Sequence, residues 1–214
     1  MKKSILAIAF VALATTACKT DKKEVETKAA EKVVETVKNP IGAFKVNVAD
    51  SKITWVGTKL TGSSHNGDMK IQSGVFDVAD GIVKAGEFVI DMNSINCLDL
   101  EGGKKEKLEG HLKNADFFET DKFPTAKFVV TGSEIKEGKT LITGNLTLKN
   151  ITKSITIPAL VTETTDAATI KSDAFKIDRT AFGVTYKSNS IDAALKDKAI
   201  DDLMEMSIDV IAKK

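Results

Sequence analysis

The sequence predicts an all-β fold, an antiparallel β-barrel of about eight strands with two short helices. Two observations support this prediction. Apolar and polar residues alternate along most of the chain from Phe44 onward, and turn-forming residues separate the alternating segments. Alternation with a period of two is typical of antiparallel strands that have one face in the core and the other in water.

The alternation delimits the expected strands. Ile142, Leu146 and Leu148 share one face of their segment, for example, and the residues between them are polar. Short turns that contain Asp80-Gly81 and Glu137-Gly138 join consecutive segments, as in β-hairpins. A meander of this kind can close into a barrel, which removes exposed edges and can leave room for one small ligand. The expected strands cover residues 44–50, 52–60, 69–79, 82–92, 125–136, 139–149, 152–163, 167–178 and 202–212.

Two stretches depart from the alternation. In residues 103–115, Leu108 and Leu112 are four positions apart among Lys and Glu, which favours a short amphipathic helix. Residues 190–198 are expected to form a second short helix. The length and the absence of repeats predict one domain, residues 44–214, behind an N-terminal extension.

The N-terminus is typical of a signal peptide, assigned to residues 1–17. Lys2 and Lys3 precede an apolar run of about ten residues, Ile5 to Ala14, which is too short to span a bilayer as a helix. The protein is therefore expected to be exported.

Cys18 follows the small residues Thr15, Thr16 and Ala17. This arrangement resembles a lipobox, in which the thiol is acylated and the chain is cut before it, although Thr15 stands where Leu is usual. The prediction is a lipidated Cys18 that anchors the protein to a membrane of the cell envelope, in the periplasm or at the outer membrane. The alternative is an ordinary secretory signal with a free Cys18. Residues 18–43 are rich in Lys and Glu and are expected to form a flexible tether.

Charge and cysteine content narrow the classes of function. Removal of residues 1–17, which include Lys2 and Lys3 and no acid, leaves a net charge of −1 with both signs interleaved. No nucleic-acid partner is therefore expected. Cys97 is interpreted as a small buried hydrophobe, with a reactive or metal-binding thiol as the alternative. The sequence leaves the oligomeric state open.

Five motifs of the domain are distinctive: Asp91–Ile95, Gly110–Phe118, Phe123–Phe128, Gly144–Lys153 and Asp178–Gly183. Together they resemble the motifs of the YceI-like domain, and the resemblance runs from about Ile53 to the C-terminus. It implies a lipocalin-like barrel in the cell envelope that binds a polyisoprenoid or another long-chain amphiphile and has no catalytic activity. The chain departs from the family in an insertion at residues 186–201 and in Cys97, where Thr or a similar residue is frequent.

A closed sheet with an apolar interior can bury a long alkyl or isoprenoid chain, which is unfavourable in water by roughly 25 cal/mol per Å². The alternative is that the inward side chains fill the barrel and leave no cavity. The residues predicted to line an apolar cavity are Trp55, Phe76, Phe88, Phe128, Met204 and Met206.

Two polar residues are candidates for contact with a ligand head group. His65 lies in a polar loop or strand end, and Arg179 is the single arginine of the chain. A planar guanidinium supplies a geometry that Lys cannot. For Arg179 a structural contact within the Asp178–Arg179 turn is favoured and head-group contact comes second. For His65 the other interpretation is a structural histidine hydrogen-bonded to the backbone. His111, in the first helix, is also interpreted as structural.

Enzymatic functions are not expected. The chain has no G-x-S-x-G nucleophile motif and no phosphate-binding or dinucleotide-binding glycine motif. His65, Cys97 and His111 do not have a usual metal-ligand spacing, so neither a metal nor a cofactor is predicted. Two hypotheses remain: an envelope lipoprotein that sequesters or transports an apolar ligand, and a non-enzymatic module with a filled barrel that acts in envelope stress or binds a protein.

Overall fold

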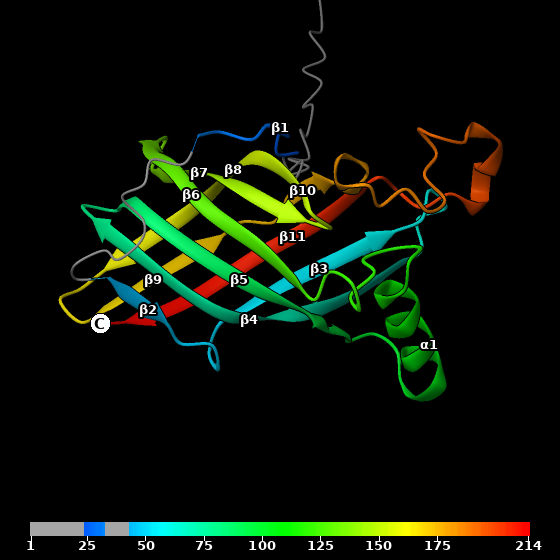
Figure 1. The fold of residues 1–214 in the computed structure, drawn as a ribbon, viewed down its shortest axis with the longest axis horizontal. Helices are drawn as coiled ribbons and strands as arrows, with labels where there is room; N and C mark the ends of the chain where they lie inside the picture. Colours follow the sequence, from blue (N-terminus) through cyan, green and yellow to red (C-terminus); the bar gives the residue numbers. More distant parts are fainter. Residues whose placement is uncertain (1–23, 33–42) are drawn as a thin grey trace, which may run out of the picture.

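The computed structural model describes residues 24–32 and 43–214 (Figure 1). One helix, α1 (Gly102–Lys113), and two short 3₁₀ helices, Arg179–Phe182 and Ala193–Lys198, accompany the strands. The strands are β1 (Lys28–Ala29), β2 (Phe44–Val46), β3 (Lys52–Thr58), β4 (Ser64–Ala79), β5 (Ile82–Cys97), β6 (Thr125–Lys136), β7 (Lys139–Leu148), β8 (Ile151–Glu163), β9 (Ala167–Ser172), β10 (Phe175–Asp178) and β11 (Leu203–Lys213).

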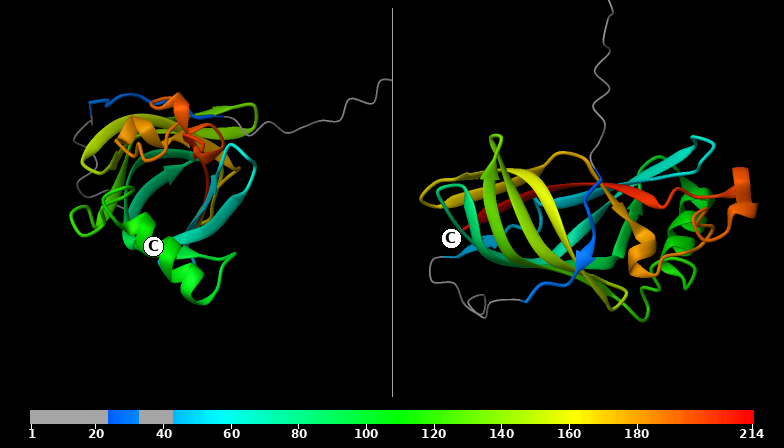
Figure 2. Two further views of the ribbon diagram at one scale, coloured as in Figure 1. Left: turned by 90° about the vertical axis from the view of Figure 1, so that its right-hand side faces the viewer. Right: turned by 90° about the horizontal axis from the view of Figure 1, so that it is seen from above.

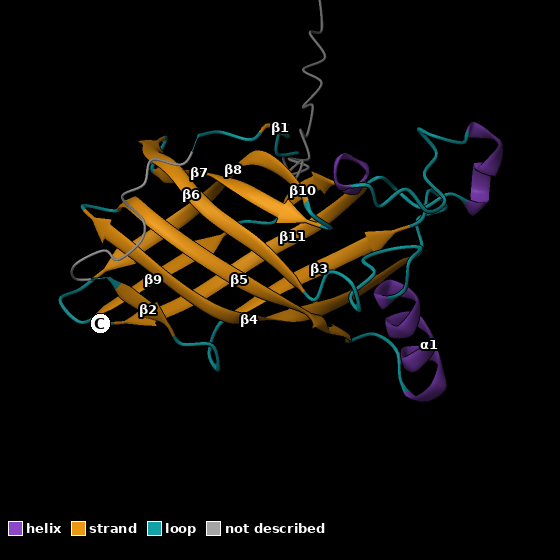
Figure 3. Ribbon diagram, viewed as in Figure 1, coloured by secondary structure: helices purple, strands orange, loops and turns teal. Residues whose placement is uncertain are grey.

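The strands close into a ring. From β4 to β9 each strand pairs antiparallel with the next, β9 pairs with β11, and β3 joins β11 back to β4. At one end of the barrel, β2 takes the place of β3 between β4 and β11. At the other end, β10 takes the place of β9 beside β11. Figure 3 shows the strands as one wall with α1 at one end. The predicted antiparallel, lipocalin-like barrel of about eight strands is confirmed.

The hairpin turns follow from local backbone preference. Positive φ angles occur at both central residues of Asp80-Gly81, Glu137-Gly138 and Lys149-Asn150. This is the type I′ geometry, whose twist matches that of the flanking strands. The two turns predicted from the sequence lie where expected, and Lys149-Asn150 is a third.

Several strand boundaries differ from the expectation. Strand β4 begins at Ser64 instead of residue 69, and β5 extends to Cys97 instead of residue 92, because the added residues pair with each other and with β3. Their polar side chains hid this pairing from the alternation pattern. The expected strand 167–178 is divided into β9 and β10.

The helix predictions have different outcomes. Helix α1 matches the expected segment 103–115 within two residues. The second expected helix is a short 3₁₀ segment, Ala193–Lys198, with a non-helical residue at Lys196. Asp192 caps its first turn by accepting a hydrogen bond from the Ala194 N–H.

Residues 24–32, which we call the strap, lie against the outside of the barrel. Strand β1 pairs with β8 near Ser154, and Glu24 pairs with Lys176 of β10. The strap thus bridges β8 and β10 at the place where these strands have no direct pairing. Backbone groups at this gap would otherwise lack partners. Because these pairings hold the strap on the barrel, residues 24–32 are not part of the expected flexible tether. The predicted signal peptide and Cys18 lie outside the described residues.

Phenylalanine rings fill one part of the interior. Phe44 stacks on Phe76 at 5.9 Å between ring centroids, Phe76 on Phe88 at 5.8 Å, and Phe88 lies 6.5 Å from Phe128. Offset ring pairs at these distances are favourable contacts. The end of the barrel near β2 is therefore closed by packed side chains.

Candidate ligand-binding site

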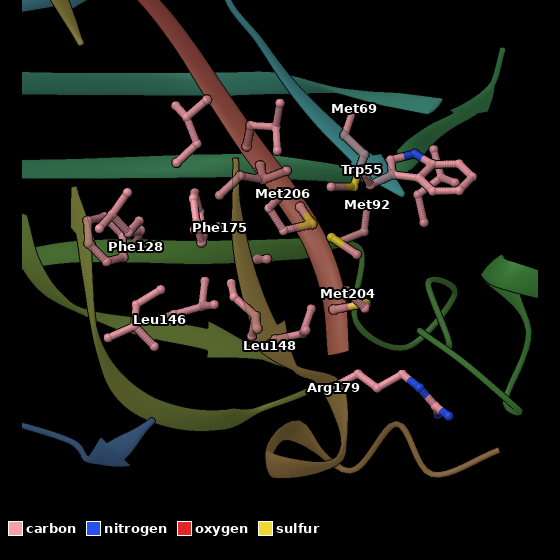
Figure 4. A pocket seen from close by; sticks show the side chains of 18 of the residues that line it. Trp55, Met69, Met92, Phe128, Leu146, Leu148, Phe175, Arg179, Met204 and Met206 are labelled. Carbon is pink, nitrogen blue, oxygen red and sulfur yellow. The ribbon is translucent and has the colours of Figure 1, made fainter. Parts of the chain in front are cut away.

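The barrel encloses a cavity of about 190 Å³ (Figure 4), and Phe88 and Phe128 of the phenylalanine stack border it. Five residues of the predicted apolar set line it: Trp55, Phe88, Phe128, Met204 and Met206. The interior is therefore not completely filled. A dry apolar cavity of about 150 Å³ suffices to bind benzene, so this volume accommodates a comparable hydrocarbon segment.

The cavity extends toward the end of the barrel that carries α1. Leu112 of α1, Phe118 in the following loop and Ile200 all contribute to its lining. We call this end the mouth. The left view of Figure 2 faces it, with α1 on one side and residues 183–201 on another.

Phe76 does not line the cavity, contrary to the prediction. It is fully buried between the Phe44 and Phe88 rings, in the closed end of the barrel. Alternation places a side chain on the inner face of a barrel, but it does not specify the depth at which packed core ends and a cavity begins.

The Arg179 side chain is buried, and all three nitrogens of its guanidinium are hydrogen-bonded within the protein. It is 2% exposed, and its Nε donates to the backbone oxygen of Asp201 at 3.0 Å. Nη1 donates to the Val184 oxygen at 2.7 Å, and Nη2 donates to the Ile200 oxygen at 3.1 Å and to the Asp202 carboxylate at 3.3 Å. Arg179 borders the cavity while its guanidinium points away (Figure 4). The geometry favours a structural role, with Asp202 in place of the expected contact within the Asp178–Arg179 turn.

His65 lies outside the cavity, near the mouth. Its Nδ1 is 2.8 Å from the carboxylate of Asp99, which also accepts hydrogen bonds from the Asn66 N–H and the Cys97 thiol. Hydrogen bonds from the Asn66 N–H, from His65 and from the Cys97 thiol together lower the pKa of Asp99 to about 2, against the effect of burial. Head-group contact by His65 remains a prediction.

Cys97 is buried and free, as the sequence suggested. Burial raises the pKa of its thiol, and the hydrogen bond to Asp99 acts in the same direction. A thiol with these properties is poorly reactive. In the described part of the chain, no group of three or more His, Cys, Asp or Glu residues could hold a metal ion.

Several residues that line the cavity were not among those predicted from the sequence. The alternation had already placed Ile142, Leu146 and Leu148 on an apolar face of their strand, so a signal for them was available. Met69 and Met92 lie near Met204 and Met206 (Figure 4). Four unbranched, polarisable side chains in one region can adjust to ligands of different shape.

The polar side chains that line the cavity are hydrogen-bonded within the protein. Ser172 accepts a hydrogen bond from the Ile208 N–H, and the Asp201 carboxylate accepts one from the Leu203 N–H. Among the described residues, no buried side-chain nitrogen or oxygen lacks a partner. The cavity therefore favours hydrocarbon, because a polar group placed in it would lose its hydrogen bonds to water.

An aromatic cluster connects the elements around the mouth. The His111 ring lies edge-on to Phe117 and to Tyr186, at 5.0 Å in both cases. His111 Nε2 is 3.0 Å from the Asp116 carboxylate. The cluster joins α1 to the inserted segment 186–201 and so supports the structural role expected for His111.

A closed antiparallel barrel with an apolar cavity defines the lipocalin-like class of fold. No helix in the part of the chain described is long and apolar enough to span a membrane.

Residues 44–212 match the model of the YceI-like domain. The chain belongs to this family, as the sequence motifs indicated.

Curated relatives match over part of their length. A UPF0312 protein of Shewanella denitrificans is 40% identical over 85 residues, which are 39% of this chain and 41% of the relative. Protein YceI of Salmonella arizonae is 36% identical over 94 residues, 44% of this chain and 47% of the relative. The matches thus span less than half the length of these relatives.

Solved structures share the fold at low identity. A polyisoprenoid binding domain from Saccharophagus degradans superposes with a TM-score of 0.60 at 14% identity and covers 79% of this chain and 97% of its own. BcnA of Burkholderia cenocepacia has a TM-score of 0.58 at 21% identity, with coverage of 78% and 99%. At these identities the likeness concerns the fold.

Proposed function

We propose that the protein is an envelope lipoprotein, anchored through an acylated Cys18, that binds the hydrocarbon part of a polyisoprenoid or fatty amphiphile in its barrel for sequestration or transport. The observation that carries the proposal is the apolar cavity of about 190 Å³, whose polar lining side chains are hydrogen-bonded within the protein. The related fold of a polyisoprenoid binding domain supports this class of ligand. The function is binding without catalysis.

The geometry favours a ligand that enters tail first. The phenylalanine stack closes one end of the interior, and Arg179 and Asp201, which border the cavity, lie toward the mouth. The head group would then stay at the mouth, near His65. The volume is below the roughly 300 Å³ of typical small-molecule pockets. A long chain is therefore expected to displace the methionine side chains or to insert only in part.

Native mass spectrometry tests ligand binding directly. Protein purified from its native membrane, without added lipid, is expected to carry a bound hydrophobic molecule. Met206→Trp, which fills the cavity, should reduce occupancy at least tenfold. Leu160→Trp, on the exposed outer face of β8, is the matched control and should leave occupancy unchanged. Equal occupancy in the two variants would contradict binding in the cavity.

The anchor is tested separately. Cys18→Ser should release the protein from the membrane fraction into the soluble periplasmic fraction. Membrane association of this variant at the level of the unsubstituted protein would exclude Cys18 as the anchor. The alternative function, a protein-binding module with a filled barrel, predicts a packed interior, and the cavity disfavours it.

A further inference from the structure

Three exposed aliphatic side chains lie at the mouth, and we call them the rim. Leu60 is 52% exposed, Leu98 58% and Ile191 62%. Backbone hydrogen bonds hold their segments in place: Leu60 N donates to the Ala199 oxygen at 3.2 Å, and Leu98 N donates to the Asn66 oxygen at 2.9 Å. The turn after β3, the link from β5 to α1 and the inserted segment thus meet at one end of the barrel (Figure 1).

We infer that the rim docks on the surface of a lipid bilayer and inserts its aliphatic side chains at the boundary of head groups and acyl chains. Apolar side chains that are exposed together at one end of a protein are typical of a site that contacts lipid or another protein. A bilayer fits because the cavity behind the rim is apolar. A hydrocarbon chain could then pass between bilayer and barrel without crossing water, which is unfavourable in proportion to the apolar area exposed.

The strap places the N-terminal extension near the mouth. Glu24 pairs with Lys176, three residues before the buried Arg179 that borders the cavity. Cys18 lies six residues before Glu24, a reach of at most about 20 Å in an extended chain. Lys176 pairs with Glu205, near the start of β11. Lys213, at the opposite end of β11, is eight residues from Glu205, a distance of roughly 27 Å along the strand. A membrane anchor on Cys18 therefore favours an orientation in which the mouth, and not the closed end, lies next to the bilayer. This step rests on the proposed lipidation.

The charges around the rim indicate which kind of bilayer fits. Lys59 and Lys187 lie near it, but so do Asp99 and Asp192. With both signs present, attraction to an anionic surface is not the expected driving force. Docking should depend on apolar insertion and should occur on zwitterionic lipid.

Quenching by brominated lipid tests the contact. The mature chain, produced without acylation, is coupled through Cys18 to a maleimide lipid in phosphatidylcholine vesicles that carry bromine on the acyl chains. Cys97 should not compete, because it is fully buried. Leu60→Trp reports on the rim, and Leu160→Trp is the control, since Leu160 is 58% exposed on β8 far from the mouth. The unsubstituted protein gives the contribution of Trp55, the single native tryptophan.

The expected result is at least threefold stronger quenching for Leu60→Trp than for Leu160→Trp, unchanged when a fifth of the lipid is anionic. Adding Ile191→Asp to Leu60→Trp should abolish the difference. Equal quenching at the two positions, or none at either, would overturn the inference. Ligand binding measured in vesicle-free solution is an independent readout, so failure to dock and failure to bind ligand are distinguishable.

Discussion

Glu31 and Asn145, which are 114 positions apart in the chain, hold each other by two hydrogen bonds. The Asn145 side chain accepts from the Glu31 N–H at 2.8 Å and donates to the Glu31 carbonyl at 2.7 Å. The Glu31 carboxylate accepts from the hydroxyls of Thr131 and Ser154. Asn145 is buried on the outer side of the wall. The strap is therefore part of the folded domain.

Loss of this contact should release the strap. Asn145→Ala removes both hydrogen bonds to Glu31 and is expected to lower the free energy of unfolding in urea by about 1–3 kcal/mol. Trypsin should then cleave the native protein after Lys28 or Lys32. Thr143→Ala is the control, since Thr143 lies on the same strand as Asn145 and loses only one hydroxyl contact, to Thr156 of β8. Unchanged resistance to trypsin in Asn145→Ala would show that the strap is held by other contacts.

Asp99 should make stability depend on pH in the acid range. Its folded pKa of about 2 is below the ordinary 3.8, so its contribution is complete above pH 4 to 5 and is lost as the pH falls toward 2. Because Asp99 is partly exposed, we expect Asp99→Asn to lower the free energy of unfolding at pH 7 by about 1 kcal/mol. Urea unfolding from pH 2 to 7 measures the difference, which should shrink toward pH 2. A difference that is constant over this range would contradict the assignment.

Arg179 should be required for the fold. In Arg179→Lys an ammonium cannot reach the three carbonyls and the Asp202 carboxylate together, and the expected loss of stability is about 3–5 kcal/mol. Thermal unfolding measures it. Lys171→Met is the control, because it removes an exposed ion pair with Asp209 and should cost less than about 1 kcal/mol. A variant with normal stability and weakened ligand binding would instead support head-group contact.

Phe76 should affect stability and not ligand binding. Phe76→Leu leaves space in the closed end and is expected to lower the free energy of unfolding by about 1–3 kcal/mol. The affinity of the folded protein for a fluorescent fatty-acid probe should be unchanged, because Phe76 does not line the cavity. Fluorescence titration and urea unfolding of the same preparation separate the two effects. A large loss of affinity with normal stability would place the ligand against Phe76.

Much of the fold could be predicted from local patterns. Alternation placed Ile142, Leu146 and Leu148 on an inner face, and Asp80-Gly81 and Glu137-Gly138 specified hairpins, because strand periodicity and turn conformation depend on neighbouring residues. Part of the candidate site followed for the same reason. Trp55 and Met206, for example, were predicted to face the cavity and do so.

The sequence by itself determined the strand order along the chain, the inner and outer faces and the family. Only the tertiary structure decided the depth of the cavity, the ends of β4 and β5, and the position of the strap. Phe76 and Phe88 look alike in the pattern, yet only Phe88 borders empty space, because cavity shape depends on side chains from many strands. The polar segment that contains Glu31 has no apolar pattern that would predict its position. Its partners Thr131, Asn145 and Ser154 lie on β6, β7 and β8 and come together only when these strands pair.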